Sequence, residues 1–351
     1  MSSQSDSFRP ARQWAIDPRA IDHSRITPRH AKGNLYWPEP LIASTGSFRS
    51  IVVQPRHSTL LLVALALCGP TYCGCKGLRR PSTLSQLAES REFIFEGQAQ
   101  ALDGDWDRAE ELFRDAVEAC PQDERAHSHL AESLWNQGQT DEALVAQQKA
   151  VEINPNEVRH RLELGDMYLA AGNPQGALVE AEAVLDIDRL SFAGWNLKGN
   201  ALDALGRQRD ALAAFQRSLA IDDSQNWVYA RVAHLYEREQ RPQRALATWQ
   251  TLEDRFDSDA VPPDVLYHEA LALRELTRHE EAIERLLLAR RHDPDSIELL
   301  ATLADLQWEV GDRGSAQLTL NGLRNGWPNH PRVESMAERW RQQEASGRVL
   351  R

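Results

Sequence analysis

The residue types that most often carry chemistry occur in this sequence without the spacings that active sites need. His127 and His129 are two residues apart, which places them on different faces of a helix, whereas ligands on one face are three or four apart. His279-Glu280-Glu281 begins like a zinc-protease motif but lacks the second histidine. Glycine-rich phosphate loops and the G-x-S-x-G elbow of hydrolases are absent as well. We therefore expect no catalytic residues, no metal site, no cofactor and no small-molecule substrate.

Three of the four cysteines lie within eight residues and follow a short apolar run. Their C-x4-C-x-C spacing lacks the distant second pair of a structural zinc site. The run from Leu60 to Leu67 follows Arg56, an order typical of a bacterial signal peptide. Cys75, preceded by Gly74, and Cys68, preceded by Leu67, are the candidates for lipidation. A cleaved export signal, an uncleaved anchor and a plain linker all remain open.

A run of this length is shorter than the roughly 20 apolar residues that cross a bilayer. A signal is also expected at the start of a chain, so translation starting near Val52 or Val53 is one hypothesis for its position. The predicted organisation is a disordered extension over 1–55, a signal-like or anchor segment over 56–75 and a linker over 76–89. A repeat array over 90–330 and a capping helix with a tail over 331–351 complete it.

Charge divides between the two parts of the chain. The formal net charge is -12, but the residues after position 75 hold 32 basic against 48 acidic residues, a net of -16. A negative field repels phosphate backbones, so nucleic acid is not an expected partner of the folded part. The membrane is expected as a partner only through an N-terminal lipid or anchor. Other proteins remain as the predicted partners.

An alanine recurs every 34 residues through most of the chain, with one insertion of three residues around 260–262. Twelve residues before each alanine stands another small residue, and small residues allow two antiparallel helices to approach closely. Gly138, Gly172, Gly206 and Gly311 fall in one column that predicts left-handed turns between helices. The alanines are Ala109, Ala143, Ala177, Ala211, Ala245, Ala282 and Ala316.

Prolines after several of these units predict helix ends, and Pro331 starts a last amphipathic helix. Trp195, Gly199, Ala211 and Phe215 reproduce much of one unit's signature. The pattern resembles the tetratricopeptide repeat. The resemblance implies an all-α, right-handed superhelical solenoid of seven helix-turn-helix repeats with a C-terminal capping helix. It also implies a concave face built from the first helix of each repeat.

We expect the partner-binding groove on that face. Exposed tryptophans there would serve as anchors, and asparagines would hold a peptide backbone. An alternative is that the tryptophans pack against neighbouring helices. The predicted groove residues are Arg91, Arg125, Glu132, Trp135, Arg159, Asp166, Asn196, Asn200, Trp227, His234, Asp264, Tyr267, Asp305 and Trp308.

Arg91, Arg125 and Arg159 recur every 34 residues and predict a basic ladder along the groove. Acidic residues of the later repeats, such as Asp264, Asp305 and Glu309, predict the opposite sign at the other end. The alternative is that the arginines are solvated and paired locally with Glu132 and Asp166.

The predicted function is a non-catalytic scaffold that binds peptide or helical segments of partner proteins. The layout is similar to that of bacterial envelope lipoproteins with this repeat, so an exported or lipid-anchored assembly factor is the first hypothesis. A regulatory or adaptor module in the cytoplasm is the alternative.

Overall fold

The computed structural model describes residues 83–257 and 260–345, and these residues form fifteen helices and no strand. Fourteen helices make seven consecutive pairs, and the fifteenth follows them. The first helices of the pairs are α1 (Thr83–Leu102), α3 (Glu124–Asn136), α5 (Val158–Ala170), α7 (Phe192–Ala204), α9 (Asn226–Arg238), α11 (Pro263–Glu275) and α13 (Ile297–Glu309). The second helices are α2 (Trp106–Ala119), α4 (Thr140–Ile153), α6 (Pro174–Ile187), α8 (Gln208–Ile221), α10 (Pro242–Glu253), α12 (His279–His292) and α14 (Arg313–Gly326). The last helix is α15 (Pro331–Ala345).

The alanine column lies where the two helices of each pair meet. All seven of these alanines are completely buried. Two of the glycines twelve positions earlier lie equally close to the partner helix. A Cβ atom added to Gly97 would lie 2.5 Å from the Phe113 ring, and one added to Gly199 would lie 2.6 Å from the Phe215 ring. The periodic small residues therefore set the helix spacing, as the sequence predicted.

The turns between paired helices use the left-handed backbone conformation. The four predicted glycines have φ between +74° and +87°, and Gly104 joins them at +81°. In units five and six the same position is Gln240, with φ of 56°, and Thr277, with φ of 61°. The turn geometry is thus kept in seven units even where the sequence has lost glycine.

Prolines follow the ends of α2, α4, α12 and α14, as predicted. The three-residue insertion falls between α10 and α11, which have the longest connection among the fifteen described helices; α10 is the shortest of these helices at 12 residues. The repeat therefore continues across the insertion without losing its helix pairing.

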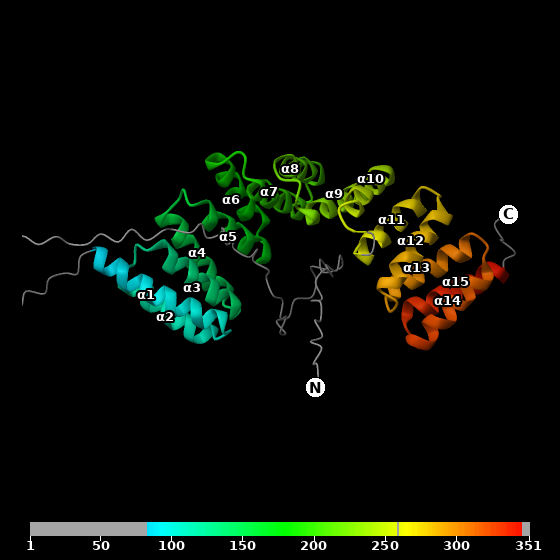
Figure 1. Cartoon of the computed structure of the whole chain (residues 1–351), viewed down its shortest axis with the longest axis horizontal. Coiled ribbons are helices and arrows are strands. Elements are labelled where there is room, and N and C mark those ends of the chain that lie inside the picture. The colour runs from blue at the N-terminus through cyan, green and yellow to red at the C-terminus, as the bar shows by residue number, and fades with distance from the viewer. Residues whose placement is uncertain (1–82, 258–259, 346–351) are drawn as a thin grey trace, which may run out of the picture. The chain divides into compact units, whose positions relative to one another are not determined.

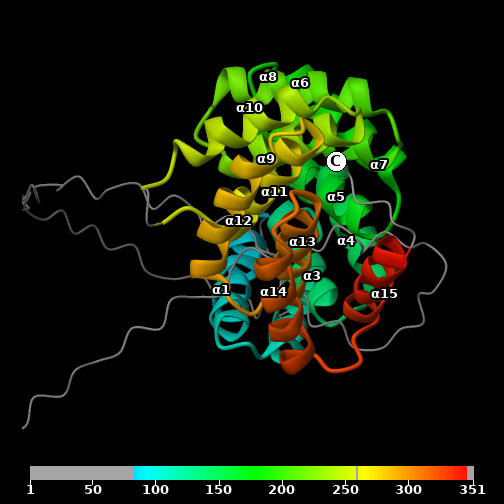
Figure 2. The same cartoon turned by 90° about the vertical axis from the view of Figure 1, so that its right-hand side faces the viewer.

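The pairs stack in sequence order, and each second helix also packs against the first helix of the next unit. The two second helices that flank α9, α8 and α10, both lie above α9 in the two perpendicular views (Figures 1 and 2). First helices contact one another directly, as α1 does with α3 and α5 with α7. The first helices thus line a common face, which we call the groove. At its C-terminal end α15 packs on α13 and α14, in red in Figure 2.

The buried side chains of α15 are Val333, Met336, Ala337 and Trp340, at the i, i+3, i+4 and i+7 spacing of the amphipathic helix predicted from Pro331. This helix therefore closes the apolar end of the last pair, which is the role of a solenoid cap. Together the helices form the predicted all-α solenoid.

Candidate functional site

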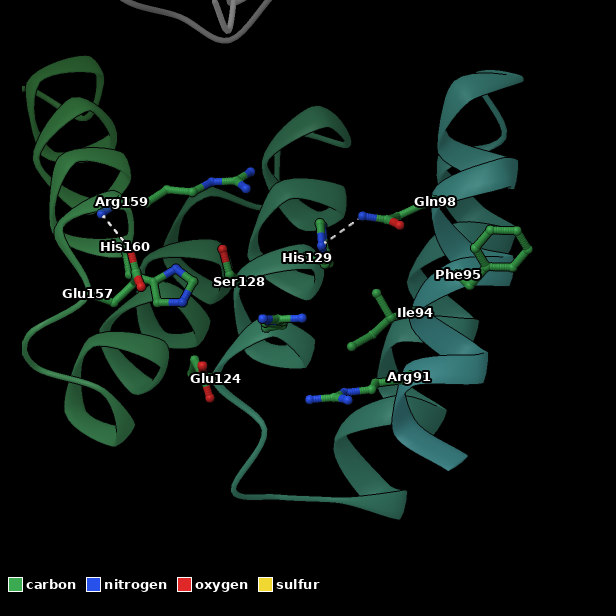
Figure 3. Close-up of a pocket in the computed structure, with 11 residues that line it drawn as sticks. Arg91, Ile94, Phe95, Gln98, Glu124, Ser128, His129, Glu157, Arg159 and His160 are labelled. Atoms are coloured by element: carbon green, nitrogen blue, oxygen red, sulfur yellow. Dashed lines mark hydrogen bonds between the residues drawn. The ribbon is translucent and has the colours of Figure 1, made fainter. Parts of the chain in front are cut away.

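The three predicted ladder arginines lie around one pocket at the N-terminal end of the groove. Arg91 comes from α1, Arg125 from α3 and Arg159 from α5, and the pocket has a volume of about 540 Å³. Arg91 and Arg159 extend toward α3 from opposite sides in Figure 3. The 34-residue period brings them together because each occupies the same turn of successive first helices.

The three arginines differ in their partners. Arg159 Nε donates a 2.7 Å hydrogen bond to Glu163 Oε1, four residues along α5. Arg91 and Arg125 are exposed, and neither guanidinium has a hydrogen bond or ion pair to another described residue. The positive charges of Arg91 and Arg125 therefore remain available to a ligand.

Arg91 and Arg125 are solvated, as the alternative expected, and Glu132 interacts electrostatically with Arg159. Neither Glu132 nor Asp166 forms a direct ion pair with an arginine of the described part of the chain, however. Glu132 Oε2 lies 3.3 Å from Nδ1 of His129 and forms no ion pair with an arginine. Asp166 forms no ion pair among the described residues. Surrounding protein and the nearby Glu163 carboxylate raise the pKa of Asp166 to about 6.

A buried polar network supports the floor of the pocket. Ser128 Oγ donates to Glu163 Oε2 at 2.9 Å, and Gln147 Nε2 donates to the same oxygen at 3.0 Å. Burial opposes ionisation of Glu163, but interactions with His160, Arg159 and Ser128 outweigh it and lower the pKa of Glu163 to about 2. Glu163 is therefore a carboxylate at neutral pH, and it fixes the position of Arg159.

Sequence reasoning missed this network, although one signal was present. Gln147 stands where the repeat usually has an aromatic residue, and it is buried. A buried amide requires a hydrogen-bonding partner, and Glu163 from the next repeat provides it.

Apolar groups complete the pocket lining. Phe95 on α1 is 74% exposed, whereas its neighbour Ile94 is buried. His129 stacks on Phe113 with ring centroids 5.3 Å apart, and its Nε2 lies 3.0 Å from Gln98 Nε2 (Figure 3). Glu124 and Glu157 also line the pocket, so it combines the three arginines and apolar side chains with two carboxylates.

The predicted tryptophan anchors are not free side chains. Trp135 is half-buried and packs against the core of the first two units. Trp227 is half-buried, meets the Phe215 ring edge-on and donates from Nε1 to Gln225 Oε1 at 3.2 Å. The alternative that these rings pack against neighbouring helices is therefore correct for both.

Trp308 and Asp305 contact the cap. Trp308 is only 7% exposed, and its ring stacks on Trp340 of α15 with centroids 4.3 Å apart. Asp305 accepts hydrogen bonds from Trp340 Nε1 at 3.1 Å and from Arg339 Nη2 at 2.9 Å. The expectation that Trp308 is an exposed anchor was wrong because α15 covers it.

The acidic C-terminal part of the groove is largely neutralised. Glu309 is paired with Arg274 and Asp305 with Arg339. Asp264 at the start of α11 is an exposed residue with no ion-pair partner among the described residues. The surrounding protein still removes part of the water around its carboxyl group, and this desolvation raises the pKa of Asp264. The predicted change from positive to negative charge along the groove is therefore weaker than the sequence indicated.

The remaining predicted groove residues lie between these two ends. Asn196 is buried, and its Oδ1 has no hydrogen-bond partner within the described part of the chain, so it lies beneath the surface. Asn200 is half-buried on α7. Tyr267 Oη lies 3.3 Å from Thr302 Oγ1 of the next first helix. His234 Nδ1 lies 2.9 Å from Glu237 Oε2.

The two lipidation candidates, Cys68 and Cys75, and the whole signal-like segment lie outside the described residues. Among the helices that the structure does describe, none combines the length and the apolar character needed to cross a bilayer.

Comparison with known proteins agrees with the helix pattern. The family described as Tetratricopeptide repeat matches residues 96–158, 129–192, 162–226 and 232–297, which together cover more than half of the chain.

Solved structures share the same fold at low sequence identity. The pilF protein of Pseudomonas aeruginosa is 17% identical with a TM-score of 0.53, covering 63% of this chain and 99% of its own. PilW, described as a widely conserved type IV pilus biogenesis factor, is 18% identical with a TM-score of 0.54, covering 61% and 98%. A tetratricopeptide repeat protein from Parabacteroides merdae is 14% identical with a TM-score of 0.52, covering 72% and 98%.

Proposed function

Because this chain belongs to the tetratricopeptide-repeat family, we propose that it is a non-catalytic scaffold whose groove binds extended or helical segments of partner proteins. The observation that carries this proposal is the pocket lined by Arg91, Arg125 and Arg159 on three consecutive first helices. Two of these guanidinium groups have no partner among the described residues, so a ligand can take their hydrogen bonds.

The spacing of the arginines suits a peptide. Adjacent packed helices lie about 8–10 Å apart, and an extended peptide advances about 3.3 Å per residue. An extended ligand would therefore present about every third side chain to the next arginine. Arginine binds carboxylates with a pair of parallel hydrogen bonds, so the favoured ligand has carboxylates at that spacing. Phe95 and Ile94 add apolar contact at the α1 side.

The proposal extends to the location of the protein. We place it in the bacterial envelope, exported or lipid-anchored, where it would help to assemble a protein complex. The basic-then-apolar order at Arg56 and Leu60–Leu67, followed by Cys68 and Cys75, supports export. PilW, a pilus biogenesis factor, has a similar fold. N-terminal sequencing of the mature protein tests this part: a start at or just after Cys75 supports export, and an intact Met1 favours the cytoplasmic adaptor.

Site-specific crosslinking tests the binding function. A photoreactive phenylalanine analogue at Phe95 places the crosslinker in the pocket, and the same analogue at Leu318 is the matched control. Both side chains are 74% exposed, but Leu318 is on the second helix α14. The proposal expects one or a few defined proteins crosslinked at Phe95 in the native cells and not at Leu318. Equal crosslinking patterns at both positions would contradict it.

A further inference from the structure

Two histidines and a glutamate from neighbouring first helices meet in the groove. His234 and Glu237 lie three residues apart on α9, and His268 lies on α11. One nitrogen of each histidine and one carboxylate oxygen all lie within 4.8 Å of one another. His234 Nδ1 is 2.9 Å from Glu237 Oε2, and His268 Nδ1 is 3.3 Å from Glu237 Oε1. All three residues are partly exposed, so the cluster borders solvent, although the His268 Nδ1 atom itself is buried.

Packing fixes the orientation of both imidazole rings. The His268 ring stacks on Trp249 with centroids 5.0 Å apart and planes 17° apart. The His234 ring meets His268 edge-on at 4.5 Å and Trp249 edge-on at 5.0 Å. Trp249 is a core residue of α10, so its indole is an immobile support. The ligand nitrogens are therefore held in place before any ion binds, which lowers the entropic cost of binding.

Among the described residues, one of these nitrogens has only the Glu237 carboxylate near it and forms no hydrogen bond of good geometry. His268 Nδ1 is buried, and the described residues give it no hydrogen bond, since its approach to Glu237 lacks hydrogen-bond geometry. A buried polar atom without a partner costs free energy unless something satisfies it. A metal ion bound to the nitrogen lone pair would do so.

We propose that His234, Glu237 and His268 form a binding site for one divalent transition metal ion, of the class that imidazole and carboxylate ligands select, such as Zn²⁺. Tetrahedral Zn²⁺ with bonds of about 2.0–2.1 Å holds its ligand atoms about 3.3 Å apart. His234 Nδ1 is 2.9 Å from Oε2 and His268 Nδ1 is 3.3 Å from Oε1, two different oxygens of the Glu237 carboxylate. One oxygen and one nitrogen of each histidine lie within 4.8 Å of one another, so small side-chain rotations would bring the three ligand atoms to this spacing. Three protein ligands leave the fourth position to water or to a donor atom of a bound partner.

Neighbouring groups fit this role. Trp249 Nε1 donates a 2.8 Å hydrogen bond to Glu237 Oε1, an outer contact of the kind that orients metal ligands. Asp264, one helical turn before His268 on α11, interacts electrostatically with both histidines and adds negative charge beside the site. The metal site does not depend on the arginine pocket, which lies on α1, α3 and α5.

The test measures Zn²⁺ binding to the full chain without a polyhistidine tag. All four cysteines are changed to serine in every variant, so that thiolates contribute no binding. Equilibrium dialysis counts bound Zn²⁺, and the visible absorption of bound Co²⁺ reports the ligand type and geometry. The proposal expects one equivalent of Zn²⁺ and a Co²⁺ spectrum of nitrogen and oxygen ligands in low coordination.

The variants decide whether these three residues bind the ion. His234→Ala, His268→Ala and Glu237→Gln should each weaken Zn²⁺ binding by at least about tenfold to a hundredfold. His127→Ala, on the first helix α3, is the matched control and should bind as the parent does. Circular dichroism identifies the folded variants. Glu237→Gln preserves the size and shape of the side chain, so it still tests the site if a histidine variant does not fold. No bound Zn²⁺ in the parent, or binding unchanged in all folded variants of the three residues, would overturn the proposal.

Discussion

Arg125 and Arg159 hold the same position in consecutive repeats and line one pocket, yet only Arg159 is bound by a carboxylate, that of Glu163 at 2.7 Å. Reversing the charge of Arg159 would leave the buried Glu163 carboxylate without its partner. Removing one partner of a buried ion pair is strongly destabilising, so this change would damage the fold. Reversing Arg91 and Arg125 changes the pocket charge without breaking an ion pair among the described residues. Arg91 and Arg125 are therefore the residues with which to test ligand binding.

The alanine column predicts a large effect of overpacking. Ala211 is completely buried between α7 and α8, so Ala211→Leu forces extra volume into the closest approach of the pair. We expect a loss of about 1–3 kcal/mol in the free energy of unfolding, measured by urea denaturation followed by circular dichroism. Ala99→Leu, at an exposed position of α1, is the control and should change stability little. Equal stability of the two variants would contradict the assigned packing.

The turn column predicts reciprocal effects at two equivalent positions. Gly206→Thr places a β-branched residue at φ of 74° and should destabilise the protein by about 1–2 kcal/mol. Thr277→Gly removes that strain, with φ of 61°, and should stabilise the protein by a smaller amount because glycine also gains entropy in the unfolded chain. Thermal unfolding measures both changes. A lower melting temperature for Thr277→Gly than for the parent would argue against strain at this turn.

Glu269 predicts a pH dependence of stability. It is completely buried on α11, and burial together with the Glu253 carboxylate raises the pKa of Glu269 to about 8. In the unfolded chain the carboxyl has its ordinary pKa near 4.5, so the folded state binds the extra proton between these values. Stability should therefore fall as the pH rises from about 4.5 to about 8.

Glu269→Gln should remove most of this fall, because the amide stays neutral throughout. The measurement is the free energy of unfolding at pH 5.5 and pH 8 for the parent, Glu269→Gln and the exposed control Glu280→Gln. The same pH dependence in Glu269→Gln and in the parent would assign the effect to other groups.

The sequence predicted the fold well because a fixed period constrains every repeat at once. The buried alanines and the turn glycines each recur at positions where only small residues, or a left-handed backbone, fit the packing. The period also placed Arg91, Arg125 and Arg159 on one face, since residues 34 apart occupy the same turn of successive helices.

The period could not predict which side chains of other helices contact each helix face. Trp308 holds the same helical position in its unit as the half-buried Trp135, but Trp340 of the cap covers Trp308 and buries it. His234 and His268 lie 34 residues apart, yet the three-residue insertion between their repeats shifts His268 one helical turn toward the start of its helix. The resulting contact depends on side-chain directions across two helices, and spacing within one helix carries no signal for it.

Quantitative crosslinking tests whether the groove binds partner segments through its N-terminal arginines. The yield of the partner captured at Phe95 is compared between the parent, Arg91→Glu with Arg125→Glu, and the control Arg290→Glu with Arg291→Glu on the exposed side of α12. Both double variants change the net charge equally, and circular dichroism verifies their folding. We expect at least a tenfold lower yield for the Arg91 and Arg125 double variant, with the control close to the parent. A yield at the parent's level for the folded Arg91 and Arg125 variant would contradict it.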